Sequence, residues 1–312
     1  TTCTHKKTTR MRVVFCHALC RRSVDGGARR GRLLGQQAID VLQFGDVQRA
    51  DRLAQLQTAP DASDEALYFW RLAMQHEAMH NEASVYMAQN LGVALPEVLC
   101  VGHVNVGKAQ QVDHAAPHRA LAVPAQVCSL GHAGAGFAFD NECPAHTVAL
   151  AAFEIDAQVV TWAQYLPFLQ ATGYALPPHV RCVQGDWQVE VFGQWQAMPM
   201  GAPVVHVNAW DAQAWCQWAG RRLPTEAEWT SAANTHGFAW GHVWEWTADD
   251  FSPYPGFVPH PYREYSEPWY EGHRVLKGAC RATSQHLVDV RYRNFFVPER
   301  RDIFAGFRTV AL

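Results

Sequence analysis

The sequence predicts an α+β protein with an N-terminal helical region and a larger C-terminal domain that contains little regular structure. Residues 46–92 have the apolar spacing of helices, whereas the chain after residue 125 alternates short strand-like runs with Gly, Pro and Asn turns. Twelve Trp and fifteen Phe in 312 residues suit a loop-rich fold, since large rings fill the space between irregular segments. With 48% apolar residues, a sizeable core is expected.

Residues 1–45 are an atypical basic segment without a sustained hydrophobic period. Residues 1–52 carry eleven Lys and Arg against four Asp and Glu, within a total net charge of −3. We interpret this start as a tail rather than a nucleic-acid-binding arm. No apolar run reaches membrane-spanning length, no signal-peptide core is visible, and the nine Cys have no repeating spacing. We therefore expect a cytoplasmic protein whose partners include neither nucleic acid nor a membrane.

Residues 46–92 form the predicted helical region, and its clearest element is a helix over residues 64–91. Asp64 can cap the first turn, and Gly92 supplies the left-handed residue that commonly ends a helix. Residues 93–125 are rich in Pro, Gly and Ala, and we expect them to be an interdomain linker.

The C-terminal domain, residues 126–312, is expected to contain a strand at 146–155. Thr161 then opens a helix that Pro167 should bend or shorten, because proline lacks a backbone donor. A further helix over 209–220 ends at its final glycine.

Two later features complete the expected domain. Thr225 and Glu228 have the spacing of a capping box, which predicts another helix start. From residue 241 onward Gly and Pro are frequent, so we expect turns to dominate around an aromatic core.

Residues 75–83, QHEAMHNEA, contain the motif H-E-x-x-H. His76 and His80 are four residues apart, so on a helix their imidazoles share one face and can bind one metal. Three interpretations remain open from the spacing: two histidines that bind nothing, a zinc hydrolase with Glu77 as general base, and an iron site with a third histidine from another helix. The segment NEASVYMAQ that follows lacks the glycine and histidine of the longer protease motif, which weakens the zinc interpretation.

Several longer segments resemble one enzyme family. YFWRLAMQHEAMHNEASVYMAQNLG (68–92) is similar to the DinB-like helix of the ergothioneine-biosynthesis iron enzymes. Four further segments resemble the C-terminal domain of these enzymes, which has the formylglycine-generating-enzyme (sulfatase-modifying factor) and C-type-lectin-like fold. The segments are PVVHVNAWDAQAWCQWAGRRLPTEAEW (203–229), GHVWEWTADDF (241–251), PYREYSEPWYEGHRVLKGA (261–279) and RNFFVPERRDIFAGFR (293–308). The resemblance implies a DinB-like helical bundle, incomplete here, followed by that fold.

The short stretch between LPTEAEW and GHVWEW, and the sequence RNFF in place of RNWD, resemble the selenoneine synthase branch of this family. The resemblance implies an oxidoreductase with non-haem Fe(II) that uses O2. Its substrate would be hercynine (trimethylhistidine), whose imidazole C2 would be joined to selenium from a selenosugar or to sulfur from a thiol donor.

Carried over to this chain, the resemblance places His76 and His80 at two of the three iron ligands. Met79 falls where relatives place a Gln near the substrate, and Asn294 and Phe295 match residues that contact hercynine. An aromatic face suits a trimethylammonium group, which cannot donate a hydrogen bond and is held by cation–π attraction.

Three further positions follow from the resemblance. Phe257 lies near the position of a catalytic Tyr of some relatives, so a phenol is missing if the alignment holds there. Phe296 replaces an Asp that contacts the thiol donor in some members, which argues against a γ-glutamylcysteine donor. The carried-over residues leave the catalytic proton donor unknown. Arg293 and the segment GFR (306–308) are expected to hold the fold together, with the arginines pairing carboxylates or carbonyls.

Two departures from the family remain. The third iron ligand is expected from an N-terminal helix, but residues 1–45 lack its pattern, and His17 is the one candidate in an apolar context. In KGACRATS (277–284), Ala279 replaces a Gly, and Cys280 lacks the partner that formylglycine-generating enzymes have. The alternative is therefore a catalytically impaired homologue that binds hercynine without consuming O2.

Overall fold

The structure is a computed structural model in which residues 63–95 and 119–312 are described. The expectations for residues 1–45, for His17 and for most of the linker lie outside these residues. The described helices are α3 (Asp64–Asn90), α5 (Trp162–Thr172), α6 (Ala209–Ala219) and α7 (Glu226–Ala232), with short 3-10 turns η1 (Asp140–Glu142), η2 (Arg263–Tyr265), η3 (Glu267–Trp269) and η4 (Gln285–Leu287). None of the helices in these ranges is long and apolar enough to cross a membrane.

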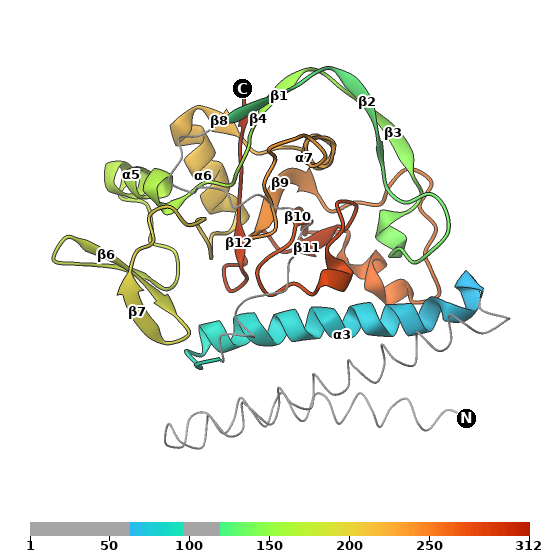
Figure 1. Cartoon of the computed structure of the whole chain (residues 1–312), viewed down its shortest axis with the longest axis horizontal. Coiled ribbons are helices and arrows are strands. Elements are labelled where there is room, and N and C mark those ends of the chain that lie inside the picture. Colours follow the sequence, from blue (N-terminus) through green and yellow to red (C-terminus); the bar gives the residue numbers. More distant parts are fainter. Residues whose placement is uncertain (1–62, 96–118) are drawn as a thin grey trace. The chain divides into compact units, whose positions relative to one another are not determined.

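The strands in residues 119–312 form four small sheets, and Figure 1 shows how they are arranged. A four-stranded sheet has the order β1–β4–β13–β8, from Ala120–Val123, Phe153–Asp156, Val310–Ala311 and Arg221–Arg222. A second has the order β11–β10–β9–β12, from Asn294–Phe296, Arg274–Gly278, Trp244–Asp250 and Ala305–Gly306. The hairpin β2 (Gln126–Leu130) and β3 (His146–Leu150) and the meander β5 (Val180–Val183), β6 (Asp186–Val191) and β7 (Gln194–Ala197) complete the described strands.

The helix expected at 64–91 is confirmed as α3. It ends at Asn90, and Gly92 has φ +63° as expected for the residue that stops it. Gly193 of the β6–β7 turn lies against this stop, where an added Cβ would come within 2.5 Å of the Gly92 carbonyl oxygen. The end of α3 therefore fits against the β6–β7 turn because Gly193 has no side chain, whereas Gly92 has the left-handed conformation that favours glycine.

Three expectations for the C-terminal domain are confirmed at its helix ends. Gly220 caps α6 in the left-handed conformation, and Thr225 and Glu228 form the capping box of α7. Thr161 caps α5, but Pro167 does not shorten that helix, which continues to Thr172. The side chains on either side of the proline, among them Tyr165 and Phe168, are buried, and their burial offsets the missing backbone hydrogen bond.

The strand expected at 146–155 is two strands. Residues 146–150 form β3 and pair with β2, whereas residues 153–156 form β4 and pair with β1 and β13. The chain leaves one sheet and enters another at residues 151–152, and a local pattern of apolar residues does not reveal such a change of partner. Strand β1 (Ala120–Val123) falls within the expected linker 93–125, so the C-terminal sheet begins before residue 126.

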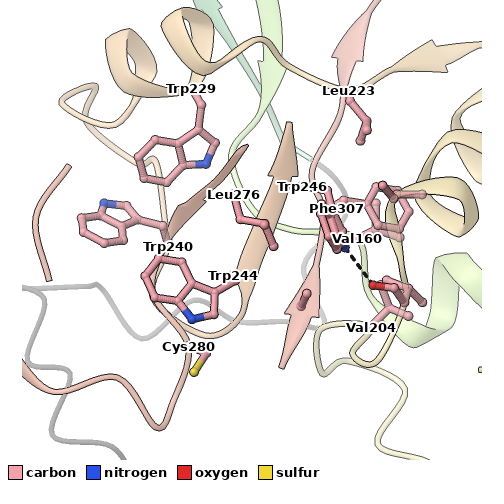
Figure 2. Close-up of a cluster of buried hydrophobic side chains, with 14 of the residues drawn as sticks. Val160, Val204, Leu223, Trp229, Trp240, Trp244, Trp246, Leu276, Cys280 and Phe307 are labelled. Atoms are coloured by element: carbon pink, nitrogen blue, oxygen red, sulfur yellow. Dashed lines mark hydrogen bonds between the residues drawn. The ribbon is translucent and has the colours of Figure 1, made fainter. Parts of the chain in front are cut away.

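Tryptophans fill the core around β9 and β10 (Figure 2). Trp229, Trp244 and Trp246 are almost completely buried, and the ring of Trp229 lies 5.5 Å from that of Trp240. The indole N–H of Trp246 donates to the carbonyl of Val207 at 2.9 Å. The large rings thus fill space between short strands, as the aromatic composition predicted, and the indole N–H groups of Trp229, Trp244 and Trp246 each keep a hydrogen-bond partner.

Buried arginines pair with carboxylates, which confirms the structural role expected of them. Arg308 and Glu245 are both fully buried and joined by a bond of 2.8 Å, and Arg293 binds Glu226 at 2.9 Å. Neighbouring Gly306 has no room for a side chain, because an added Cβ would lie 2.5 Å from the carbonyl oxygen of Val204. The segment at 306–308 is therefore part of the scaffold.

Candidate functional site

The histidine pair on α3 has the arrangement that its spacing predicts. The rings of His76 and His80 lie 4.7 Å apart between centroids and are inclined by 22°. His80 is exposed and His76 is half-buried. Two parallel imidazoles on one helix face are suitable to provide two ligands to a single Fe(II) or Zn(II) ion.

The third ligand is not found near this pair in residues 63–95 and 119–312. Within these ranges no group of three His, Cys, Asp or Glu side chains converges as a metal site. The pair thus fits two positions of a three-histidine site, and the third would have to come from outside the described ranges. Glu77, the base of the zinc-hydrolase interpretation, is only 7% exposed, which does not favour it as a base open to a peptide substrate.

Two tyrosines of the C-terminal domain face this part of α3, and the sequence analysis did not select either. The ring of Tyr262 lies 6.2 Å from that of His76. The hydroxyl of Tyr265 lies 4.0 Å from the sulfur of Met79. Both tyrosines belong to PYREYS (261–266) and lie at or beside η2. Their spacing of three residues, which brings both side chains to one face of a 3-10 turn, was the available signal.

Met79 and Phe295 are brought together through Tyr265. The ring of Phe295 lies 6.1 Å from that of Tyr265 and stacks on Phe251 at 4.2 Å. Tyr265 also stacks on Phe139 at 4.2 Å. The rings of Phe139, Tyr265, Phe295 and Phe251 thus form an aromatic row that extends from α3 to β11. The apolar and π-rich surface of this row suits a quaternary ammonium group.

Asn294 begins β11 beside this row and is 8% exposed. Its side-chain oxygen accepts the backbone N–H of Phe295 at 2.9 Å, which fixes the plane of the amide. An amide held in this way is oriented to recognise a polar ligand group next to the aromatic row.

Phe257 lies at the other end of the row. Its ring contacts Tyr270 at 5.3 Å, and Tyr270 in turn contacts Phe251 at 4.8 Å. Two rings thus separate Phe257 from Phe295. Among the described residues, the tyrosine whose ring contacts the histidine pair is Tyr262. The structure therefore places a phenol beside His76, where the alignment of Phe257 with the catalytic Tyr of relatives implied none.

Burial raises the pKa of two phenols of this region, Tyr265 and Tyr68. It raises the pKa of Tyr265 well above its usual value, and Tyr292, 3.5 Å away between hydroxyls, raises it further. Burial is also the main cause that raises the pKa of Tyr68 to about 12, with the nearby Asp140 adding to it. These hydroxyls are thus neutral hydrogen-bond donors rather than phenolates.

Phe296, next along β11, is covered by an arginine. The guanidinium of Arg300 lies 4.4 Å from the ring of Phe296, forms an ion pair with Asp302 at 2.8 Å, and donates to the hydroxyl of Tyr86 on α3 at 3.2 Å. Position 296 thus offers an aromatic ring and no carboxylate.

Cys280 lies in the core rather than at the aromatic row. It is fully buried, and its thiol is 3.3 Å from the hydroxyl of Thr283. Burial raises the pKa of the thiol well above its usual value, with Glu82 as the next cause, so a metal-binding thiolate is disfavoured. Gly278 has φ +92°, whereas Ala279 is not among the described non-glycine residues with positive φ, so the alanine adds no backbone strain there.

The chain is similar in sequence to hercynine oxygenases and to formylglycine-generating enzymes. Residues 110–241 and 234–311 match the sulfatase-modifying factor enzyme 1-like domain. Hercynine oxygenase of Mycolicibacterium thermoresistibile is 30% identical, covering 83% of this chain and 72% of that protein, and that of Mycolicibacterium smegmatis is 29% identical, covering 83% and 75%. Formylglycine-generating enzyme of Streptomyces coelicolor is 35% identical over 56% of this chain and 83% of that enzyme. Among solved structures, PvdO from Pseudomonas aeruginosa is 19% identical with a TM-score of 0.42, covering 61% of this chain and 93% of that one.

Proposed function

The chain belongs to the sulfatase-modifying factor enzyme 1-like family and is homologous to hercynine oxygenases, and we propose that it joins selenium or sulfur to the imidazole of hercynine. His76 and His80 would hold two coordination positions of a non-haem Fe(II) ion. The observation that carries the proposal is the closeness of this pair to the aromatic row, through the contacts of Tyr262 with His76 and of Tyr265 with Met79.

The residues of the row and of β11 would bind hercynine. The face of Phe295 suits its trimethylammonium group, and the fixed amide of Asn294 offers hydrogen bonds to its polar atoms. Met79 and Tyr265 would close the pocket on the side of α3. Holding the imidazole near the metal in one orientation lowers the entropic part of the barrier.

The reaction balances with O2 as the oxidant. Joining the C2–H of hercynine to the Se–H or S–H of the donor removes two hydrogen atoms, which leave as water with one oxygen atom of O2. The other oxygen atom remains on the chalcogen as its oxide. When bound by His76 and His80, Fe(II) would supply the one-electron chemistry that lets O2 react with closed-shell substrates. Tyr262, whose ring lies 6.2 Å from that of His76, would give a proton beside the histidine pair.

A selenosugar is the donor that we propose, with a thiol as the alternative. Phe296 offers no carboxylate for the ammonium group of an amino-acid thiol, and Arg300 is already paired with Asp302. An uncharged sugar needs neither partner. The choice is tested by offering a 1-selenosugar, cysteine and γ-glutamylcysteine in turn and identifying the product by mass spectrometry.

The second candidate function is hercynine binding without turnover. It is favoured by one observation, since no third ligand converges on the pair within residues 63–95 and 119–312. Such a protein would keep the aromatic row and lose only tight iron binding.

Anaerobic Fe(II) titration with hercynine present, followed by buffer exchange and measurement of retained iron, separates the two candidates. One retained iron per chain, lost in His76→Ala and kept in the control His286→Ala at an exposed position of η4, would support the enzyme. No retained iron, together with hercynine binding that Asn294→Ala weakens and the exposed control Asn234→Ala does not, would support the binding protein. Unchanged hercynine affinity in Asn294→Ala would refute the proposed pocket.

A further inference from the structure

Glu82 is a buried carboxyl group on α3 that the proposed chemistry does not use. It follows His80 by two residues and Met79 by three, and only 6% of its surface is exposed. Its Oε1 accepts the indole N–H of Trp244 at 2.7 Å, and its Oε2 accepts the hydroxyl of Thr283 at 2.6 Å. The two donors come from β9 and from the loop after β10, so one side chain joins α3 to two segments of the C-terminal domain.

The two residues that donate to Glu82 are themselves buried. Trp244 is 1% exposed and belongs to the tryptophan cluster, where Figure 2 shows its indole nitrogen directed toward the side on which Cys280 lies. Thr283 is fully buried, and its hydroxyl also accepts the backbone N–H of Cys280 at 2.9 Å. The single proton of this hydroxyl has two acceptors within reach, Glu82 at 2.6 Å and the sulfur of Cys280 at 3.3 Å, and the shorter contact is the one to Glu82.

Glu82 belongs to one stripe of α3 that faces the C-terminal domain. Met79, Glu82, Tyr86 and Gln89 are spaced by three, four and three residues, which places them on one side of a helix. Each contacts the domain: Met79 meets Tyr265, Tyr86 accepts from Arg300, and Gln89 binds the backbone of the β6–β7 hairpin at 2.8 and 2.9 Å. Glu82 is the member of this stripe that follows Met79, and it lies closer in sequence to the histidine pair than Tyr86 and Gln89 do.

We propose that Glu82 is a positioning residue that fixes the rotation of α3 about its axis, so that Met79 and His76 face Tyr265 and Tyr262. A carboxyl group presents two acceptors in a fork, and here they meet donors from two different segments. A helix held by both bonds cannot turn without breaking one of them. Side-chain ends lie about 5–6 Å from a helix axis, so a rotation of about 20° would displace them by roughly 2 Å. Displacements of this size are enough to reduce catalysis strongly.

The effect on turnover rests on the proposed function, whereas the effect on the rotation of α3 does not. The test therefore needs a readout of rotation that is independent of iron and hercynine. Two methionines of α3 provide it, because Met79 is half-buried against Tyr265 and Met87 is 42% exposed. Their rates of oxidation to the sulfoxide by dilute peroxide, measured by peptide mass spectrometry, report how each is covered.

Three variants of the full chain are compared with the unmodified protein. Glu82→Leu keeps a side chain of similar volume and removes both hydrogen-bond acceptors. Glu82→Gln keeps the fork, since its oxygen can accept from Trp244 and its amino group can donate to the hydroxyl of Thr283. Thr283→Val removes one of the two donors and covers the case in which Glu82→Leu does not fold.

The expected result is a ratio of Met79 to Met87 oxidation that rises about threefold or more in Glu82→Leu, rises less in Thr283→Val, and stays unchanged in Glu82→Gln. Hercynine affinity and turnover per folded molecule should fall about tenfold or more in Glu82→Leu and be retained in Glu82→Gln. An unchanged oxidation ratio in folded Glu82→Leu and Thr283→Val would overturn the positioning role. If the ratio responds as expected but the unmodified protein binds neither iron nor hercynine, the positioning role stands and the proposed function fails.

Discussion

Replacing His206 should change the pH dependence of stability, and the magnitude follows from its surroundings. His206 is 3% exposed, its Nδ1 donates to the carbonyl of Arg301 at 3.2 Å, and its ring lies 5.0 Å from that of His179. Burial, and secondly the neighbouring His179, lower its pKa from 6.5 to about 4. His179 in turn binds Glu190 and the Asn90 side chain at the end of α3. His179 and His206 therefore lie at the junction of α3 with β6.

The direction in which pH changes the free energy of unfolding follows from proton binding in the folded and unfolded chains. Between pH 6.5 and about 4 the unfolded chain binds a proton at this residue and the folded chain does not. The contribution to stability is therefore complete above pH 6.5 and is lost as the pH falls toward 4. A shift of about 2.5 pKa units corresponds to about 3 kcal/mol in the free energy of unfolding.

His206→Asn is the suitable perturbation, since His206 has φ +62° and Asn tolerates this left-handed conformation. Urea unfolding at a series of pH values from about 7 to 4 gives the free energy of unfolding for each protein. The variant should lose about 3 kcal/mol less than the unmodified chain over this range, because the contributions of groups that do not interact with His206 cancel in the difference. The exposed control His286→Asn should parallel the unmodified chain. Equal losses in His206→Asn and the unmodified chain would refute the assignment.

Four further outcomes are expected. Burial, opposed by Lys277, raises the pKa of Glu142 from 4.5 to about 7. Its contribution to the free energy of unfolding is therefore complete below pH 4.5 and is lost as the pH rises through 7. In Glu142→Gln this decline with pH should be absent from the free energies measured by urea unfolding. Gly306→Ala should lower the free energy of unfolding by about 1–3 kcal/mol, because its Cβ would overlap the Val204 carbonyl oxygen at 2.5 Å. Phe295→Leu should weaken hercynine binding roughly 2- to 30-fold in calorimetry, through the lost cation–π attraction. Tyr262→Phe should lower the rate of product formation by about 100-fold while hercynine affinity is retained.

These outcomes can each fail in a distinct way. A pH profile unchanged in Glu142→Gln would mean that the carboxyl is not held protonated in the folded chain. Unchanged stability of Gly306→Ala would contradict the close packing at β12. Equal hercynine affinity of Phe295→Leu and the unmodified chain would remove the aromatic row from the proposed pocket, and full activity of Tyr262→Phe would remove its phenol from the proton transfers.

The local elements of this fold follow from the sequence because they depend on residues a few positions apart. The stop of α3 at Gly92, the end of α6 at Gly220 and the capping box of Thr225 and Glu228 are all set within one or two helical turns. The stacking of His76 on His80 follows in the same way from a spacing of four. For these features the periodicity of the helix is sufficient.

What surrounds the histidine pair was decided by the tertiary structure alone. The bonds of Glu82 to Trp244 and Thr283 span 162 and 201 positions in the chain, and no local pattern connects such partners. The same reason explains why Tyr262, rather than the position of Phe257, supplies the phenol beside His76. The sequence by itself determined which helix carries two histidines on one face, because helical periodicity is local. Only the packing of that helix against the C-terminal domain decided which side chains the histidines meet, because those contacts depend on the whole chain being folded.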